Sequence, residues 1–391
     1  MKILVIGAGM AGLTYAIVAC KNGFDVTVAE RNARVGRKVA MSGNGKCNIG
    51  NANVNAACFN GSPIVKSVLE EISVAEYKKF LVSCGIYTYT DQEGRMYPLS
   101  DSASNVVDCL RYQLKKFGGK LLLDTEVTTL TRVKGRYYVE VDGEVYIYDS
   151  VVLACGSGSQ AEKPNISNLI PQGVFTPVVP SLVPVKIRDM DGILNGLRAR
   201  AKVTLYDNNV LLGSESGEVL FKDYGLSGIC VFNLSAIIAR RTVQRKTANY
   251  RFVVDVVPYL NEWDLEEIIY ERLAAGEDGK LFYGILHNKI AEHVVKCAGA
   301  TATAAELAHT AKNLSFEFDR LLDWSMSQVT AGGIIDGHVD IKTLALSNGV
   351  VALGEVLNVD GICGGNNLYF AAASALYTFT PAQRERAYAI C

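Results

Sequence analysis

Three glycines near the start of the chain constrain its fold more than any other feature of the sequence. A short apolar run over residues 2–6 leads into Gly7, Gly9 and Gly12, which have the spacing G-x-G-x-x-G, and small and apolar residues continue over 10–20. This order predicts a buried strand, a tight turn and a helix. It is typical of the first turn of a dinucleotide-binding domain, where the glycines permit the turn, the approach of a pyrophosphate and the packing of helix on strand.

An acidic residue stands at the end of the second predicted strand. Residues 24–30 alternate in polarity as a strand does and end in Glu30. A carboxylate at this place accepts hydrogen bonds from ribose hydroxyls and repels a 2′-phosphate, so NADP is not expected as the tightly bound nucleotide. The alternative, a glycine-rich turn without a ligand, does not account for the strand, helix and acid together.

The composition is that of a globular enzyme with more than one core. The chain has 391 residues, of which 49% are hydrophobic and 20% charged. A net charge of −1 gives no electrostatic reason to expect nucleic acid or an anionic membrane as a partner. Glycines interrupt the first apolar run, which argues against a signal peptide, and no apolar stretch is long enough to span a membrane. We expect a cytoplasmic location and a small-molecule substrate, and the sequence does not predict an oligomeric state.

The cysteines and histidines do not indicate a metal site. The ten cysteines are scattered without a Cys-x-x-Cys pair, and only four histidines are present. We therefore expect reduced thiols and no metal ion.

Two further glycine-rich segments favour FAD over NAD as the bound dinucleotide. Residues 36–51 are rich in Gly and Asn, are not expected to form a regular element, and offer amides and cations that could wrap a pyrophosphate and the edge of a flavin. An apolar strand over 350–353 leads to Gly354 and Glu355, expected near the ribityl phosphate. The helix over 364–379, expected to be the last of the chain, could direct its amino-terminal amides at the flavin N1–C2=O region, where negative charge grows on reduction.

A third turn of this kind follows the apolar strand at residues 151–154. Cys155, Gly156, Ser157 and Gly158 begin a second G-x-G-x-x-A pattern, so a second nucleotide site is an alternative here. Pro164 interrupts the region where its helix would run, and we favour a crossing into a second domain instead.

The middle of the chain changes character. Four prolines at 171, 177, 180 and 184 predict a domain boundary, residues 182–232 predict antiparallel strands, and residues 233–322 predict mostly helices. Asn233 and Asn261 are the expected helix N-caps in this segment.

Six sequence blocks resemble those of the BaiN/YhiN-like flavoproteins, which are described as NAD(P)/FAD-dependent oxidoreductases or aminoacetone-oxidase-like FAD enzymes. They are GRKVAMSGNGKCNIGN (36–51), MYPLS (96–100), SLVPVK (181–186), YGLSG (224–228), QVTAGG (328–333) and GEVLNVDGICGGNNL (354–368). The resemblance covers nearly the whole chain. It departs where the family's Gly-Gly-Gly-Arg-Cys-Asn is Gly43-Asn44-Gly45-Lys46-Cys47-Asn48, and where its Leu-Asp is Leu357-Asn358.

The resemblance implies an α/β protein with a two-part Rossmann-type FAD-binding domain and inserted β-barrel-like and helical subdomains. The expected segments are 1–178 and 323–391 for the FAD-binding domain, 179–232 for the barrel-like insert and 233–322 for the helical insert. The residues expected to contact FAD are Gly7, Gly9, Met10, Ala11, Gly12, Glu30, Arg31, Gly36, Arg37, Lys38, Ser42, Gly43, Asn44, Gly45, Lys46, Cys47, Asn48, Val127, Ala154, Cys155, Gly156, Gly354, Glu355, Asp360, Gly361, Gly365, Asn366, Asn367 and Leu368.

Three residues are candidates for a part in catalysis, each with a plainer alternative. Cys47 is either a reactive thiol near the flavin or a small packed residue, and packing is favoured. Asn48 could bond the flavin rim or only fix its own turn. Tyr97 could donate a proton in the reduction of an activated C=C, or could simply pack, and packing is favoured.

The expected function is an FAD-dependent oxidoreductase. NADH or NADPH, bound transiently, would reduce the flavin, and N5 would pass hydride to a small conjugated carbonyl compound, as the bile-acid reductases of the family suggest. Three alternatives stay open: an O2-dependent oxidase of a small amine or ketone, a flavin-binding redox sensor without turnover, and an NAD dehydrogenase.

Overall fold

The computed structural model describes residues 1–141, 143–157, 166, 168–246 and 248–389, and it divides into two compact units. Unit 1 contains residues 1–179 and 329–391, and unit 2 contains residues 180–328. Both ends of the chain therefore belong to one unit, as the predicted fold class requires. The second G-x-G-x-x-A pattern and Pro164 lie largely outside the described residues.

Unit 1 is built on a parallel sheet of five strands in the order β19-β10-β1-β2-β6. Its centre is β1, where Val5 lies between Val28 of β2 and Val152 of β10. Because such strands are covered on both faces, they consist of continuous apolar runs. The last strand comes from the far end of the sequence, where Val351 pairs with Val152. The bounds are β1 (Lys2–Ile6), β2 (Asp25–Ala29), β6 (Lys120–Leu122), β10 (Ser150–Leu153) and β19 (Val351–Ala352).

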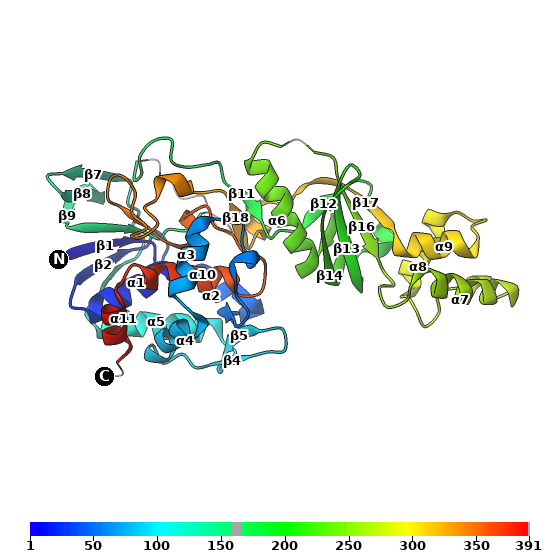
Figure 1. Cartoon of the computed structure of the whole chain (residues 1–391), viewed down its shortest axis with the longest axis horizontal. Helices are drawn as coiled ribbons and strands as arrows, with labels where there is room; N and C mark the ends of the chain where they lie inside the picture. The colour runs from blue at the N-terminus through cyan, green and yellow to red at the C-terminus, as the bar shows by residue number, and fades with distance from the viewer. Residues whose placement is uncertain (142, 158–165, 167, 247, 390–391) are drawn as a thin grey trace. The chain divides into compact units, whose positions relative to one another are not determined.

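Helix α1 (Met10–Lys21) is buried along every residue except the last and packs beside α10 (Asn366–Tyr377) in the core of unit 1 (Figure 1). A helix that is apolar all round must be covered on all sides, and helices from both ends of the chain do this. The other helices of the unit are α2 (Arg37–Met41), α3 (Pro63–Glu71), α4 (Val74–Ser83), α5 (Ala103–Lys116) and α11 (Pro381–Tyr388).

Unit 1 also contains two antiparallel sheets of three strands each. Their strands are β3 (Gly50–Asn51), β5 (Arg95–Pro98) and β4 (Thr88–Thr90) in one, and β7 (Thr129–Val133), β8 (Arg136–Val141) and β9 (Glu144–Tyr148) in the other. The turn at Lys134 and Gly135 joins β7 to β8, and both residues have positive φ, as a tight hairpin turn requires.

Unit 2 contains a closed barrel with the strand order β12-β15-β14-β13-β16-β17. The bounds are β12 (Val185–Ile187), β13 (Arg198–Asp207), β14 (Val210–Lys222), β15 (Gly225–Ser227), β16 (Tyr250–Asp255) and β17 (Leu314–Leu321). Strands β16 and β17 lie in the stretch that the sequence assigns mostly to helices. Their alternating burial is a period-two signal too short to stand out between long helices. Barrel and helices share one apolar core, and the finer division at residue 232 stays a prediction.

The helices of unit 2 are α6 (Ile229–Val243), α7 (Glu262–Ala274), α8 (Asn288–Ala298) and α9 (Ala304–Lys312). Asn261 caps α7 as predicted, since its side chain accepts the Asp264 N–H at 2.8 Å. The predicted N-cap at Asn233 is wrong, because Asn233 lies inside α6. That helix begins earlier, after Gly228, whose φ of 113° turns the chain sharply out of β15.

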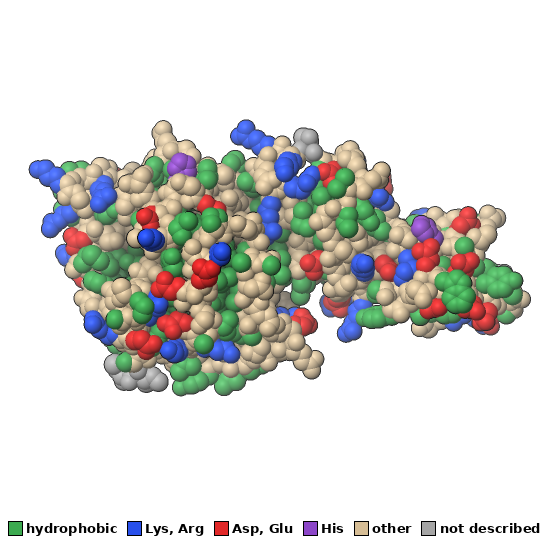
Figure 2. Space-filling view, viewed as in Figure 1, with side chains coloured by type: hydrophobic (Ala, Val, Ile, Leu, Met, Phe, Trp, Pro, Cys, Tyr) green, Lys and Arg blue, Asp and Glu red, His purple; other side chains and the backbone are tan. Residues whose placement is uncertain are grey.

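Charged side chains of both signs are interspersed over the visible surface (Figure 2), in keeping with the net charge of −1. None of the helices in the described part of the chain is long and apolar enough to cross a membrane.

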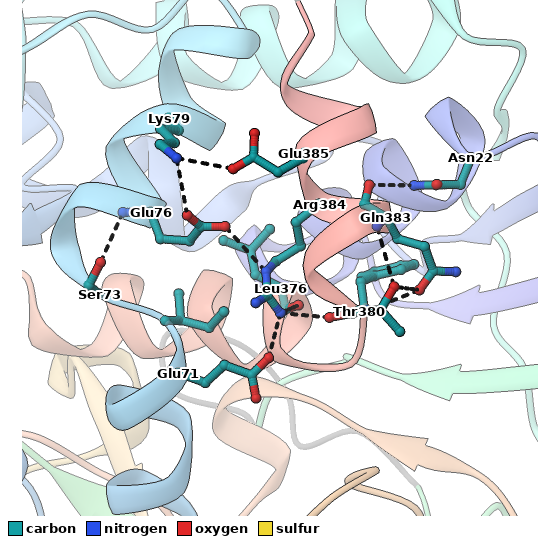
Figure 3. A network of polar contacts seen from close by, with 12 residues as sticks. Asn22, Glu71, Ser73, Glu76, Lys79, Leu376, Thr380, Gln383, Arg384 and Glu385 are labelled. Atoms are coloured by element: carbon teal, nitrogen blue, oxygen red, sulfur yellow. Dashed lines mark hydrogen bonds and ion pairs between the residues drawn. The ribbon is translucent and has the colours of Figure 1, made fainter.

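The last helix of the chain is held by a buried arginine (Figure 3). Arg384 of α11 is only 4% exposed, and its guanidinium donates to Glu71 at 2.7 Å, Glu76 at 3.2 Å and the Phe379 carbonyl at 2.6 Å. Two of these partners belong to α3 and α4, so the network joins the end of the chain to an early part of unit 1. The sequence had predicted that the helix over 364–379 is the last of the chain. That prediction is wrong, because α11 follows it.

Replacing this arginine should loosen unit 1. Removing one member of a buried ionic network leaves the others uncompensated, so Arg384→Met should lower the free energy of unfolding by about 3 kcal/mol. Far-UV circular dichroism in urea measures this, and tryptophan fluorescence follows unit 2 separately, because Trp263 and Trp324 both lie there.

The matched control is Lys79→Met. Lys79 pairs with Glu385 at 3.1 Å on the exposed side of the same network, and exposed pairs contribute little. Equal effects of the two substitutions would contradict the role given to Arg384.

Candidate dinucleotide-binding site

Three glycine-containing turns meet at the carboxyl edge of the parallel sheet. They follow β1, β10 and β19, which are neighbours in the sheet. The turns after β1 and β10 are packed backbone to backbone, because a Cβ on Gly7 would lie 2.5 Å from the Ala154 carbonyl oxygen. The turn after β19 packs on helix α1, because a Cβ on Gly354 would lie 3.1 Å from the Ala11 side chain. The chain leaves β1 toward β2 on one side and returns through β10 on the other, so this is a topological switch point, where α/β sheets bind ligands.

The fingerprint glycines have different structural roles. A Cβ on Gly12 would lie 2.0 Å from the Gly7 carbonyl oxygen, so Gly12 lets α1 pack on the turn. Gly7 has a φ of 104°, which L side chains rarely adopt. Gly9 differs, since a Cβ there would meet nothing within 4 Å. The space before Gly9 is therefore open, and the helix that follows begins without a side-chain cap, which leaves its first amides for an anion.

Glu30 is buried against the same turn. Its carboxylate accepts the Ala8 N–H at 2.9 Å through one oxygen and the Asn32 N–H at 3.0 Å through the other. These bonds hold the carboxylate beside the glycine turn, and each oxygen retains acceptor capacity for a ribose hydroxyl.

The loop over 36–51 is more regular than predicted. It contains the short helix α2 and a 3-10 turn over Ser42–Gly45. Five helical residues are too few to give a periodic signal, which is why the sequence did not reveal α2. The backbone takes positive φ at Asn44 within this turn and at Cys47 after it. Gly43 packs beside Tyr97, since a Cβ on Gly43 would lie 3.4 Å from the tyrosine ring.

A polar cluster joins this loop to the other turns. Lys38 of α2 pairs with Glu355, and the second oxygen of Glu355 accepts the Thr330 N–H at 2.9 Å. The Thr330 hydroxyl bonds to that of Ser157. Thr330 and Ser157 were not among the predicted site residues, although Thr330 lies in the QVTAGG block and Ser157 in the turn after β10.

The start of α10 rests on the same loop. Gly365 precedes the helix with a φ of 92°, and a Cβ there would lie 2.2 Å from the Gly50 carbonyl oxygen. With its amide oriented to satisfy both neighbours, Asn48 donates to the Gly50 carbonyl at 2.9 Å and accepts the Gly365 N–H at 3.1 Å. Asn51 donates to the Gly364 carbonyl at 2.9 Å. The loop thereby fixes the direction of the α10 amino terminus.

Asn366 in the first turn of α10 has an unusual environment. Its side chain is 2% exposed and donates to the carbonyls of Ile362 and Cys363, but its Oδ1 atom is buried without a hydrogen-bond partner among the described residues. A buried polar atom without a partner is costly, and a ligand that donates to it would remove that cost.

The predicted site residues fall into two groups that share α10. The first lies at the sheet edge, and the second surrounds the start of α10 and the loop that supports it. The first group is Gly7, Gly9, Met10, Ala11, Gly12, Glu30, Lys38, Ala154, Cys155, Gly156, Gly354 and Glu355, and the second is Ser42, Gly43, Asn44, Gly45, Cys47, Asn48, Asp360, Gly361, Gly365, Asn366, Asn367 and Leu368.

The other five predicted residues border these groups or lie on the surface or in the core, and the Gly36 N–H donates to the Ala8 carbonyl of the first glycine turn at 2.8 Å. Arg37 is exposed on α2, Lys46 is exposed and pairs with Asp101 at 3.4 Å, and Arg31 follows the end of β2. Gly36 packs against Val107 of α5, and Val127 is buried in the core.

The candidates for catalysis differ in their access to solvent. Cys47 is fully buried, and burial raises the pKa of its thiol to about 11, which favours the packed alternative. Tyr97 is half-buried, stacks on Tyr89 with 5.7 Å between ring centroids, and has its pKa raised above the ordinary value by burial. Across the described residues, no group of three or more His, Cys, Asp or Glu side chains is arranged to hold a metal ion.

The fold and the site together define a dinucleotide-binding protein of the Rossmann type. The chain belongs to the family described as HI0933-like protein Rossmann domain, whose model matches residues 1–379. The resemblance seen in the sequence is therefore confirmed for the family.

Named relatives match nearly the whole chain. A 3-dehydro-bile acid delta(4,6)-reductase of Clostridium scindens is 28% identical, and the match covers 95% of this chain and 97% of the relative. Ribosomal RNA dihydrouridine synthases of Haemophilus influenzae and Escherichia coli are 26% and 23% identical, with 95% of this chain and 96% and 95% of theirs covered.

Adding one methyl group at Gly365 should disrupt the support of α10. The Cβ of Gly365→Ala would meet the Gly50 carbonyl and the Asn48 side chain, at 2.2 and 2.5 Å, so the variant should have a clearly lower melting temperature than the parent. Gly85→Ala is the control, because Gly85 has a similar φ of 80° but nothing within 4 Å of its would-be Cβ. Equal melting temperatures for the two variants would contradict the importance of the contact between Gly365 and the Gly50 carbonyl.

Proposed function

We propose that the protein is an FAD-dependent reductase that saturates a carbon–carbon double bond conjugated to a carbonyl, with NADH or NADPH as a transient electron donor in the cytoplasm. The observation that carries the proposal is the pairing of an open glycine turn at the sheet edge with a second, separately supported helix terminus at α10. The first suits a nucleotide, and the second suits the ring system that distinguishes FAD from NAD.

The residues present fit FAD along its length. Glu30 would hold the adenosine ribose, and the open backbone at Gly9 with the first amides of α1 would hold the pyrophosphate. Gly354 and Glu355 would hold the ribityl portion. The loop over 42–48 and the start of α10, with the unpartnered Asn366 Oδ1, would hold the ring.

Bound FAD supplies hydride transfer at its ring, which the side chains of the protein cannot perform. The amino terminus of α10 contributes a partial positive charge that stabilises negative charge beside it. Because Gly365 and Asn48 fix this terminus, the stabilisation is in place before reaction.

Tyr97 would supply the proton that saturation of a double bond requires. Burial raises its pKa above the ordinary value, so the Oη–H is present throughout the neutral range. Its packing beside Gly43, a member of the second group of site residues, supports this role.

The names of the relatives support this substrate class. A delta(4,6)-reductase and a dihydrouridine synthase both give products that lack a double bond conjugated to a carbonyl. The net charge of −1 offers no general electrostatic attraction for RNA, and this favours a small molecule. A uridine in RNA is the second candidate substrate, because two relatives are named ribosomal RNA dihydrouridine synthases.

Anaerobic mixing of the purified protein with NADH, and separately with NADPH, tests the donor step through the visible flavin absorption. Bleaching supports the proposal, and a steroid-type dienone or a uridine-containing RNA is then offered to the reduced protein. Return of colour with the dienone supports a small substrate, and return with RNA alone transfers the assignment to the second candidate. A coloured protein that neither donor bleaches contradicts an NAD(P)H-linked reductase and favours an oxidase or a sensor.

Tyr97→Phe should slow reoxidation by the enone roughly 100-fold or more, because it removes the proton donor, and should leave reduction by NAD(P)H unchanged. Tyr89→Phe is the control, since Tyr89 is the stacked neighbour and bonds to Asp101 at 2.7 Å on the exposed side. Unchanged reoxidation in Tyr97→Phe would return Tyr97 to a packing role.

A further inference from the structure

A histidine of unit 2 lies between a cysteine and an aspartate, and each of its ring nitrogens is within hydrogen-bonding distance of one of them. Cys297 Sγ lies 3.5 Å from His293 Nε2, and His293 Nδ1 lies 3.1 Å from Asp191 Oδ2. His293 and Cys297 stand one turn apart on α8, and Asp191 precedes the 3-10 turn Gly192–Leu194, which packs on that helix. These residues belong to none of the sequence motifs discussed above.

The histidine is held in one orientation. It is 8% exposed, and its ring lies nearly parallel to that of Phe316 in β17, at 13° and 6.2 Å between centroids. Asp191 faces one ring nitrogen, so in the neutral ring that nitrogen carries the hydrogen and the other has a free lone pair directed at the thiol. This is the order of groups by which a base activates a nucleophile.

The aspartate is itself firmly held and ionised. It accepts the Ile193 N–H at 3.2 Å and the Lys296 ammonium at 2.8 Å, and these bonds hold the pKa of its carboxyl far below the ordinary range. An ionised Asp191 stabilises the imidazolium that forms when His293 takes a proton.

The thiol differs from the other cysteines in its access to solvent. Of the described cysteines, only Cys297 is exposed, and the others are buried or half-buried. Partial burial and Asp191 raise its pKa, while Lys296 lowers it, and Glu292 is the other charged residue of this turn of α8. The thiol is thus mostly protonated at neutral pH, and its reactivity depends on a base that removes the proton during attack.

We propose that Cys297 is a nucleophilic thiol, activated by His293 and Asp191, that is covalently modified by small electrophiles of the conjugated carbonyl class. The Sγ–H proton passes to His293 Nε2 while sulfur forms a bond to the β-carbon. The carbon–carbon π bond opens, and the proton held by His293 is passed on to the α-carbon, so His293 returns to its neutral form and no oxidant, reductant or leaving group is required. The proposal is independent of FAD and of the proposed reductase function.

Acrylamide is the probe, and peptide mass spectrometry of the full chain gives the rate at each cysteine. At about pH 7.5, Cys297 should react roughly ten-fold or more faster than N-acetylcysteine, a free thiol that has no attached base. A thiol that was merely exposed, with its raised pKa, would react more slowly than the free thiol. That second result would overturn the proposal without any variant.

Substitution of the base gives an independent check. His293→Gln should lower the rate at Cys297 roughly ten-fold at about pH 7.5, and the two rates should converge in strong alkali, where the thiol ionises by itself. Glu292→Gln is the matched control on the exposed side of the same helix and should react like the parent, and Cys297→Ser should lose the label. Circular dichroism shows whether His293→Gln is folded. A folded variant that reacts at the parental rate would contradict the activation of Cys297 by His293.

Discussion

The turn after β1 packs on its neighbours so closely that a single methyl group does not fit at two of its three glycines. Gly12 rests on the Gly7 carbonyl, and Gly7 rests on the Ala154 carbonyl of the turn after β10. These contacts align β1, β10 and the start of α1. The one glycine with open space before it, Gly9, then lies where the first helix amides are free. The candidate site depends on this difference between crowded and open glycines.

The second half of the site depends on the far end of the chain returning to the first unit. β19 extends the sheet, α10 packs on α1 and is supported at its start by the loop over 36–51, and α11 is held by Arg384. Residues 180–328 can then form a separate unit with its own core without interrupting the site. A long insertion costs little when the segments on either side of it are fixed by their own contacts.

Much of the fold was predictable because its signals are local. The glycine spacing, the apolar runs of β1 and β10 and the N-cap at Asn261 depend on neighbours in sequence. The start of α11 carries a local signal of the same kind, since Thr380 and Gln383 form a capping box. Ser73, at the start of α4 (Val74–Ser83), forms only half of a capping box. Ser73 accepts the Glu76 N–H, while the Glu76 side chain turns to Arg384.

What could not be predicted depends on contacts between distant residues. The Thr330–Ser157 bond joins positions 173 residues apart, and no local pattern indicates that they meet. The contact between Asp191 and His293 in unit 2 was equally unpredictable, because 102 residues separate the two in the sequence. Short elements such as α2 and β16 were missed or misassigned since a few residues give no clear period.

The central claim is that the two groups of site residues hold one FAD. The most direct test is to denature the purified protein after removal of free nucleotides and to identify the released cofactor by mass spectrometry, with its amount relative to protein. The account predicts FAD, released without a covalent bond, at a ratio approaching one per chain, and a lower ratio in Glu30→Ala. Release of NAD, or a colourless protein that binds no added FAD, would contradict it.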